Sequence, residues 1–304
     1  MTDATRSGRG DAVAGAPDAA VIIPHYNDTS RLLRCLSALV PQAARHRVEI
    51  VVSDNGSDAD MTALQARFPQ VKVVVERAKG AANARNAGVA ASTAPWLFFL
   101  DSDCVPAEDW LDRAMATGGR DVIIGGRVDV FEETPPPRSG AEAFEAVFGF
   151  AQRDYIRHKY FSVTANLLTT RAMFEAVGGF DGMVSEDCDW CRRARAKGYD
   201  IEYRDDLVVR HPGRATWAAL ARKWQRVTNE AYFGNGTSVA DRVRWALRAL
   251  VVAVSPAAHL PRMVRASHLT HHERLAGAAT LIRLRLARAG WMLRQAMFSD
   301  ERRI

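Results

Sequence analysis

The chain has 304 residues, of which 48% are hydrophobic and 25% charged, and this balance excludes a mainly disordered, collagen-like or fibrous protein. Four cysteines are too few for a disulfide scaffold and fit a reducing compartment. Residues 210–304 contain 17 Arg and Lys against 5 Asp and Glu, a net charge of +12. Residues 1–209 contain 24 Arg and Lys against 30 Asp and Glu, a net charge of −6. This division indicates catalysis or binding in the acidic part and an anionic partner for the basic part.

The N-terminal residues carry no apolar segment of the kind that a secretion signal needs. Residues 1–19 are mostly Ala, Gly, Asp, Ser and Thr, so we expect a disordered lead-in. No window has the roughly 18 uninterrupted apolar residues of a confident transmembrane helix. The nearest, Trp245–Leu260, contains Arg248, Pro256 and His259. The sequence therefore favours a helix on or near a membrane over one that spans it.

Short apolar runs alternate with helical stretches in the first hundred residues. The runs typical of strands are Ala20–Pro24, Val48–Ser53, Val71–Glu76 and Pro95–Leu100. The helical stretches between them are Ser30–Leu39, Asp58–Phe68 (with Asp58 as its N-cap) and Gly80–Ala91. This alternation predicts right-handed βαβ units, and hence an α/β fold with a mainly parallel central sheet and helices on both faces.

Polar residues follow three of the predicted strands. They are His25-Tyr26-Asn27-Asp28, Asp54-Asn55-Gly56-Ser57-Asp58 and Asp101-Ser102-Asp103. Ligands of parallel sheets bind beyond the carboxyl ends of the strands, so these residues predict a site for a polar ligand that brings a cation. The two common glycine-rich phosphate loops are missing. We therefore expect Asp101 and Asp103 to hold Mg²⁺ or Mn²⁺, although an Asp-x-Asp taken alone more often marks a surface turn.

A second acidic group lies in the middle of the chain. Beyond a proline-rich break at Thr134–Pro137, we expect a helix, a strand and a short helix at Gly140–Tyr155, Phe161–Asn166 and Thr170–Val177. Glu186, Asp187 and Asp189 then open a basic helix that ends at Gly198, with Ser185 as its N-cap. The helix dipole favours carboxylates in a first turn, so a purely structural role stays open here.

These motifs, in this order, resemble the family 2 glycosyltransferases of the GT-A fold. The motifs are Pro24-x-Tyr26-Asn27, Ser53-Asp54-Asn-Gly-Ser57, Gly80-x-x-x-Ala84-Arg85-Asn86-x-Gly88, Leu100-Asp101-Ser-Asp103, Gly179-Phe180-Asp181 and Glu186-Asp187-x-Asp189. The resemblance covers about residues 20–212 and implies a GT-A catalytic domain there. Its nucleotide-binding half is about 20–104 and its acceptor half about 105–212, followed by a basic helical region at 213–304.

The resemblance also implies an activity. It is the transfer of a sugar, with inversion, from a nucleotide-diphosphate sugar (most often a UDP-sugar) to a hydroxyl acceptor such as a glycan or a lipid-linked molecule, in cell-envelope, polysaccharide or glycolipid assembly. The residues that it implies for the nucleotide are Pro24, Tyr26, Asn27, Asp54, Arg85, Asn86, Asp101 and Ser102. Those implied for the metal are Asp103, Asp101 and His211. Asp187 is implied as the general base, and Glu186, Asp189 and Trp190 as acceptor contacts, with a core role for Trp190 equally open.

One motif bears on how many sugars are transferred. Processive members of this family carry Gln-x-x-Arg-Trp, whereas the nearest string here is Asp241-Arg-Val-Arg244-Trp245, so we expect transfer of one sugar or a few.

Cys188 and Cys191 form a Cys-x-x-Cys without the second pair that a four-ligand zinc site needs. We interpret them as two unrelated cysteines of one helix.

The basic C-terminal region predicts two helices. Ala215–Phe233 has apolar residues at helical spacing and is expected to pack on the catalytic domain. Ala278–Phe298 interleaves apolar residues with arginines, which suits anionic lipid headgroups as well as simple packing with the arginines in solvent. We expect a cytoplasmic protein, peripheral on the inner membrane face if the lipid interpretation holds. No nucleic-acid module is present, and nucleic acid is not an expected partner.

Two other functions are compatible with a metal-dependent nucleotide site. A sugar-nucleotide pyrophosphorylase has a related sheet but is expected to begin with a glycine-rich loop and a following lysine, unlike His25-Tyr-Asn-Asp28. A non-catalytic nucleotide-binding protein of the membrane surface has no need of Asp187 together with Asp101 and Asp103. The residues therefore favour the transferase.

Overall fold

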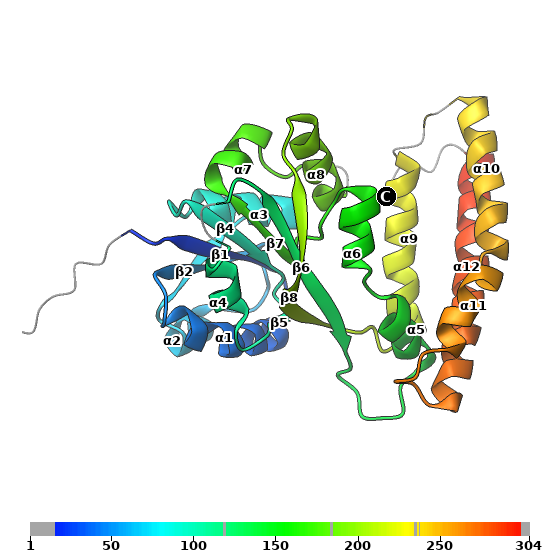
Figure 1. Ribbon diagram of the computed structural model, residues 1–304, viewed down its shortest axis with the longest axis horizontal. Helices are drawn as coiled ribbons and strands as arrows, with labels where there is room; N and C mark the ends of the chain where they lie inside the picture. The colour runs from blue at the N-terminus through cyan, green and yellow to red at the C-terminus, as the bar shows by residue number, and fades with distance from the viewer. Residues whose placement is uncertain (1–15, 118–119, 183–184, 234–235, 237, 299–304) are drawn as a thin grey trace, which may run out of the picture.

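The computed structural model describes residues 16–298, except 118–119, 183–184, 234–235 and 237. Residues 1–15 of the predicted disordered lead-in lie outside the described residues, and Ala19 at its end already belongs to the first strand. Figure 1 shows an α/β body at one end of the molecule and a layer of long helices at the other.

An eight-stranded mixed sheet forms the centre of the α/β body, in the order β3-β2-β1-β4-β7-β6-β8-β5. Its strands are β1 (Ala19–His25), β2 (Val48–Asp54), β3 (Val71–Val75), β4 (Trp96–Leu100), β5 (Val105–Pro106), β6 (Ile123–Phe131), β7 (Asn166–Thr170) and β8 (Ile201–Pro212). The first four strands pair in parallel, as predicted. β7 runs antiparallel to β4 and β6, which joins the second half of the chain to the first.

The first strands are buried because both faces of the sheet are covered. In β1, Val21 and Ile23 enter one hydrophobic cluster and Ala20 and Ile22 the other. The pairing of β1 with β2 sets His25 opposite Asp54 at the carboxyl edge. Parallel pairing therefore brings two of the predicted polar strand ends together.

Helices cover both faces of the sheet (Figure 1). They are α1 (Thr29–Ala43), α2 (Thr62–Arg67), α3 (Ala81–Ala90), α4 (Trp110–Met115), α5 (Gly140–Phe148), α6 (Gln152–Asp154), α7 (Arg171–Val177) and α8 (Glu186–Ala196), with a π-helical turn at Tyr155–Lys159. The prediction of one helix over Gly140–Tyr155 was wrong, because α5 ends at Phe148 and the chain turns before α6.

Two other predicted boundaries were wrong. The expected strand at Phe161–Asn166 begins only at Asn166, where β7 pairs with β4. The expected helix from Asp58 begins only at Thr62. Asp58 does not cap it, because Asp58 exchanges two hydrogen bonds with the side chain of Asn27 in the neighbouring strand-end loop.

The C-terminal layer consists of α9 (Trp217–Phe233), α10 (Val239–Val254), α11 (Pro256–Val264) and α12 (His271–Met297). It packs on the α/β body through α5, where Phe144 joins Leu220 and Leu281 in one cluster. α10 packs on α12 through a second cluster that includes Trp245 and Met292. The expected packing of α9 on the body is thus observed, and α12 begins earlier than the predicted Ala278.

The outer helices also expose apolar residues. Those on α10 are Val239, Val243, Leu247, Leu250, Val251 and Val254, and those on α12 are Leu275, Ile282, Leu286 and Met297. Both sets follow helical spacing, so each helix has one outward apolar stripe. Among the described residues, the stretch Val239–Val264 is long and apolar enough to cross a membrane by length and composition, with 17% of its most apolar window buried.

Candidate active site

A cavity of about 540 Å³ opens at the carboxyl edge of the sheet, where the sequence predicted a site. It lies between the ends of β1 and β4 and the start of α3. Its lining residues are Pro24, His25, Tyr26, Asp28, Asn55, Lys79, Gly80, Ala81, Ala84, Arg85, Asp101, Ser102 and Asp103. Five of the eight residues predicted for the nucleotide therefore line it, namely Pro24, Tyr26, Arg85, Asp101 and Ser102.

Arg85 is a buried cation among the residues that line this cavity. The residue is 4% exposed, and its guanidinium donates to Asp101 Oδ1 and to Glu186 Oε1, both at 2.6 Å. Burial alone would lower the pKa of Arg85, but these two carboxylates raise it above its usual value. Arg85 thus joins the end of β4 to the start of α8 and is already occupied by protein carboxylates.

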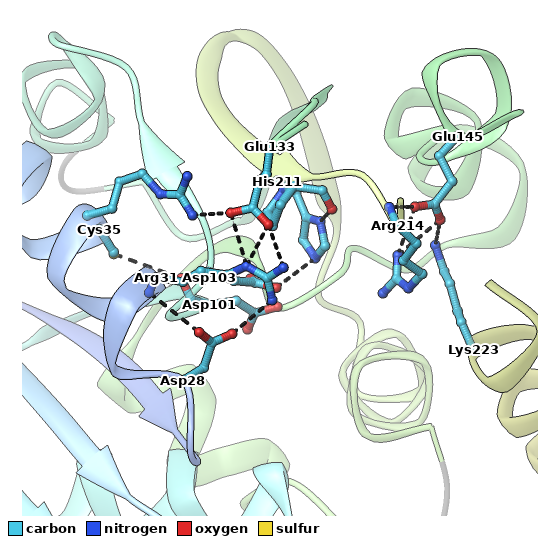
Figure 2. Close-up of polar contacts among 12 residues, drawn as sticks. Asp28, Arg31, Cys35, Asp101, Asp103, Glu133, Glu145, His211, Arg214 and Lys223 are labelled. Carbon is cyan, nitrogen blue, oxygen red and sulfur yellow. Dashed lines mark hydrogen bonds and ion pairs between the residues drawn. The ribbon is translucent and has the colours of Figure 1, made fainter. Parts of the chain in front are cut away.

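Asp103 faces His211 at the end of β8. Nε2 of His211 lies 3.3 Å from Asp103 Oδ2, while Nδ1 lies 2.8 Å from the carbonyl oxygen of Pro212. Oδ1 of Asp103 is buried without a hydrogen-bonding partner among the described residues. Burial raises the pKa of Asp103, and the nearby His211 opposes this effect. Figure 2 shows Asp101, Asp103 and His211 converging on one region.

A cation between Asp103 and His211 would satisfy both side chains. When the Nδ1 proton of His211 is donated to Pro212, Nε2 carries a lone pair that faces a carboxylate oxygen. Two acceptors at this distance require a proton or a metal ion between them, and the unpaired Oδ1 adds another ligand atom. Among the described residues no three His, Cys, Asp or Glu side chains form a complete metal cluster. The chain therefore fits a metal that takes its other ligands from phosphate and water.

Asp54 and Asn27 do not line the cavity but shape its edge. Asp54 is 4% exposed, and its oxygens accept hydrogen bonds from Ser57 and contact Nδ1 of His25 at 2.9 Å. Asn27 adopts a positive φ of 50°, a conformation that asparagine tolerates, and bonds to Ser57 and Asp58. These contacts fasten the loop after β1 to the loop after β2. Asp54 thereby holds His25, which does line the cavity.

Asn86, which was predicted to contact the nucleotide, does not line the cavity and is bonded to the segment before α8. Its side-chain amide donates to the carbonyl of Phe180 and accepts from the same residue's backbone nitrogen, both at 2.9 Å. A side chain at Gly179 would come within 2.9 Å of Asn86, so glycine is required for this close approach. Asn86 therefore anchors the segment before α8 to α3, which sets where the acidic start of α8 lies.

Glu186 and Asp187 differ in their surroundings although they are adjacent. Glu186 is ion-paired with Arg85. Asp187 has no ion pair among the described residues, and only its Oδ1 is bonded, to the Ser185 hydroxyl and the Cys188 backbone nitrogen. Burial is the main cause that raises the pKa of Asp187. Asp187 is not one of the lining residues of the cavity, but it belongs to the same acidic turn as the residue that Arg85 holds.

The other two predicted acceptor contacts have different outcomes. Trp190 is fully buried, donates to the carbonyl of Gly178 at 2.9 Å and packs between Phe174 and Phe180. The prediction of an acceptor contact was therefore wrong, because a ring with no exposed surface cannot stack on a sugar. Asp189 is half-buried and pairs with Arg193 one turn along α8.

Several residues around the cavity were not predicted from the sequence. Lys79 lines it with its ammonium 4.5 Å from the ring centroid of Tyr26, which is 53% exposed. Arg31 lies between Asp28 and Glu133, as Figure 2 shows. The sequence signal for Lys79 was its place directly before Gly80, at the start of α3. Glu133 carried no signal, because only the folded chain brings the end of β6 to α1.

A second buried charge cluster lies beyond His211 (Figure 2). Glu145 of α5 is 2% exposed and pairs with Lys223 of α9 at 2.8 Å and with Arg214 at 3.0 Å. Burial by itself would raise the pKa of Glu145, but these two cations hold it below its usual value. The cluster fixes the segment after β8, and with it His211, against the C-terminal layer.

The central sheet is mixed, and acidic residues at its strand ends line one cavity. The acidic start of α8 is tied to this cavity through Arg85. These features define a glycosyltransferase of the GT-A fold. The model of the family described as glycosyl transferase family 2 matches residues 20–179, and the chain belongs to this family.

Relatives and solved structures agree with this assignment. The chain is 29% identical over 219 residues to glycosyltransferase AglE of Haloferax volcanii, covering 69% of this chain and 71% of that protein. It is 27% identical to the pre-mycofactocin glycosyltransferase of Mycobacterium tuberculosis, covering 73% of this chain and 47% of that protein, about half its length. The fold is shared with mannosyltransferase PcManGT from Pyrobaculum calidifontis, with a TM-score of 0.57 and 19% identity over 94% of this chain and 89% of that chain. It is also shared with GalNAc-T7, with a TM-score of 0.50 and 16% identity over 66% of this chain and 44% of that chain.

Proposed function

We propose that the protein transfers one sugar, or a few, from a nucleoside-diphosphate sugar to a hydroxyl acceptor, with inversion at the anomeric carbon. The observation that carries this proposal is the ion-pair bridge from Asp101 through Arg85 to Glu186. The bridge holds the strand end that would meet the donor phosphates next to the helix start that would meet the acceptor. Donor and acceptor groups would thereby react in a fixed relative position.

The cavity supports a nucleoside diphosphate as the leaving group. Lys79 supplies a positive charge and Tyr26 an exposed ring on which a base can stack. The two solved structures of the same fold were obtained with GDP-Man and with UDP, each with Mn²⁺. We expect a UDP-sugar, and GDP-mannose is the alternative donor that a panel must include. Asp54 and Asn27 would act by holding the two loops that surround the base.

Asp103 and His211 would hold a divalent metal, Mn²⁺ or Mg²⁺. The unpaired Oδ1 of Asp103 and the orientation of the His211 ring support this assignment. When bound, such a metal stabilises the negative charge that develops on the leaving diphosphate. Asp101 would orient the site through Arg85, because its Oδ1 is already engaged there.

Asp187 is the better candidate for the general base of the two adjacent carboxylates. Glu186 is ion-paired with the buried guanidinium of Arg85, so its carboxylate is already engaged by a protein cation. Asp187 has an elevated pKa and an Oδ2 without a partner among the described residues. In the proposed step Asp187 takes the acceptor hydroxyl proton while the new glycosidic bond forms and the sugar–phosphate bond breaks. A single in-line displacement with one base gives inversion.

The C-terminal layer would place the enzyme on an anionic membrane surface, where a lipid-linked acceptor in cell-envelope or glycolipid assembly is available. The outward apolar stripes of α10 and α12 and the net charge of +12 over residues 210–304 support this location. Replacing Leu247 and Leu286 by Asp would then reduce sedimentation with anionic vesicles. The same replacement of exposed Val75, on β3, is the control.

A donor panel tests the proposed activity. UDP-sugars and GDP-sugars are incubated with the protein and Mn²⁺, and release of the nucleoside diphosphate is measured with and without candidate acceptors. Release with one donor, lost in Asp187→Asn, supports the transferase. Donor binding without any release, in the presence of a broad acceptor panel, would instead support a non-catalytic nucleotide-binding protein.

A further inference from the structure

Three arginines of the C-terminal layer lie close together without an acidic partner among the described residues. Arg285 and Arg288 project from α12, with their guanidinium carbons 5.8 and 5.0 Å from the ring centroid of Trp224 on α9. Arg248 of α10 lies near enough to act electrostatically on Arg288. Three other arginines of the region, Arg214, Arg226 and Arg244, pair with carboxylates. The cluster is therefore a local excess of positive charge.

Hydrogen-bond donors outnumber acceptors in this cluster. Nε of Arg285 and Nε1 of Trp224 are both buried with no hydrogen-bonding partner in the described part of the chain. Nε of Arg288 donates to Oγ1 of Thr228 at 3.2 Å. Guanidinium and indole groups only donate, and buried donors are normally paired. The arrangement lacks an acceptor that can take several hydrogen bonds at once.

The electrostatics agree with this deficit. Burial, together with the charges of Arg285 and Arg248, lowers the pKa of Arg288 to about 10. Burial also lowers the pKa of Arg285. Like charges that are partly removed from water without a counter-ion destabilise a fold. An anion bound among these side chains would offset both the repulsion and the unpaired donors.

From the unpaired donors and the clustered guanidinium groups, we infer that Arg285, Arg288 and Trp224 form a binding site for a phosphate group, to which Arg248 adds charge. Guanidinium groups bind phosphate through two parallel hydrogen bonds, and the indole supplies a further donor. None of these residues lines the cavity described above, so the site is separate from the one proposed for sugar transfer. The inference does not depend on that activity.

Two sources of phosphate fit this chemistry, a lipid headgroup and a soluble phosphate ester or ion. The structure favours the lipid, because the helices that carry the arginines, α10 and α12, also carry the outward apolar stripes. A headgroup phosphate could then be bound by the arginines of a layer whose stripes contact the acyl region.

The first experiment measures binding of inorganic phosphate to the full chain. Phosphate is expected to raise Tm of the wild type and to change the fluorescence of Trp224, whose ring contacts both arginines. The double variant Arg285→Gln/Arg288→Gln should bind at least tenfold more weakly. A control that replaces the exposed Arg222 and Arg265 by Gln removes the same charge elsewhere and should respond like the wild type.

Folding of the double variant is checked by its Tm without phosphate, which we expect to equal or exceed that of the wild type because no ion pair is lost. The charge-preserving variant Arg285→Lys/Arg288→Lys tests whether misfolding explains the weaker phosphate binding of the double variant. It should fold, retain part of the affinity and lose the two-bond geometry of the guanidinium. Trp224→Phe should remove the fluorescence response while leaving a Tm response.

The second experiment distinguishes the sources. For a lipid ligand, vesicles with 30 mol% phosphatidylglycerol should bind the wild type at least tenfold more tightly than the double variant, with no such difference for phosphatidylcholine vesicles. For a soluble ligand, inorganic phosphate should discriminate between the two proteins and vesicles should not. If the double variant and the charge-matched control behave alike in both assays, the site does not exist and the arginines are solvated cations.

Discussion

Arg85 on α3 and Glu186 at the start of α8 form a 2.6 Å ion pair between residues that lie 101 positions apart in the sequence. The same guanidinium binds Asp101 at the end of β4. One buried cation thus joins the end of β4 to the start of α8. The predicted role of Arg85, a contact to the nucleotide, is replaced in our proposal by a role in positioning two acidic segments.

Arg85→Met should destabilise the protein by about 2–3 kcal/mol, because two partly buried carboxylates lose their only shared cation. Chemical denaturation measures this loss. Arg120→Met makes the same change in a surface ion pair with Glu202, where the arginine is about half exposed, and should cost less than about 1 kcal/mol. Equal losses in the two variants would show that the Arg85 bridge contributes no more to the free energy of unfolding than a surface ion pair does.

Asp187→Asn should abolish sugar transfer while making the fold more stable. The amide oxygen can still accept from Ser185 and Cys188, but the charge that burial disfavours is gone. We expect a higher Tm, unchanged donor binding and a loss of activity of about 10²–10⁴-fold. Asp189→Asn, in the same helical turn, is the control and should keep most of the activity. Near-normal turnover of Asp187→Asn would remove Asp187 from the mechanism.

The pH dependence should carry the signature of Asp187. A general base must be ionised, so kcat/KM should fall as pH is lowered through a pKa above the roughly 3.9 of an ordinary Asp. The stability of the fold should change with pH in the opposite direction to the activity. Because the folded-state pKa is raised, the ionised carboxylate costs stability above that pKa and nothing below the unfolded-state pKa. The Tm advantage of Asp187→Asn should therefore be full at neutral pH and vanish near pH 3.5, where scanning calorimetry can follow it.

Asp103→Asn should weaken metal-dependent donor binding. The amide replaces a carboxylate that pairs with His211 and has a buried, unpaired oxygen. We expect at least a tenfold higher Mn²⁺ concentration for half-maximal activity, measured by titration with the donor at saturation. Asp28→Asn, at another residue of the same cavity, should shift the Mn²⁺ requirement much less. An unchanged requirement in Asp103→Asn would place the metal elsewhere.

The sequence alone determined the parallel strands of the first hundred residues and the polar edge at which they end. Apolar runs such as Val21–Ile23 can only be buried in a sheet covered on both faces, and parallel pairing then places Tyr26 and Asp101–Asp103 at one edge. Local patterns also predicted α7, and a helix beginning with the acidic turn that contains Glu186. These features follow from periodicity and capping, which depend on neighbouring residues.

Only the tertiary structure decided what the polar residues touch. Asn86 bonds to Phe180, Arg85 bridges two carboxylates and Trp190 is enclosed by aromatic rings, all through contacts between distant parts of the chain. The antiparallel β7 and the late start of α2 arose in the same way, from pairing with β4 and from the Asn27–Asp58 bonds. A residue's type fixes which bonds it can make, whereas the partner it finds depends on how remote segments pack.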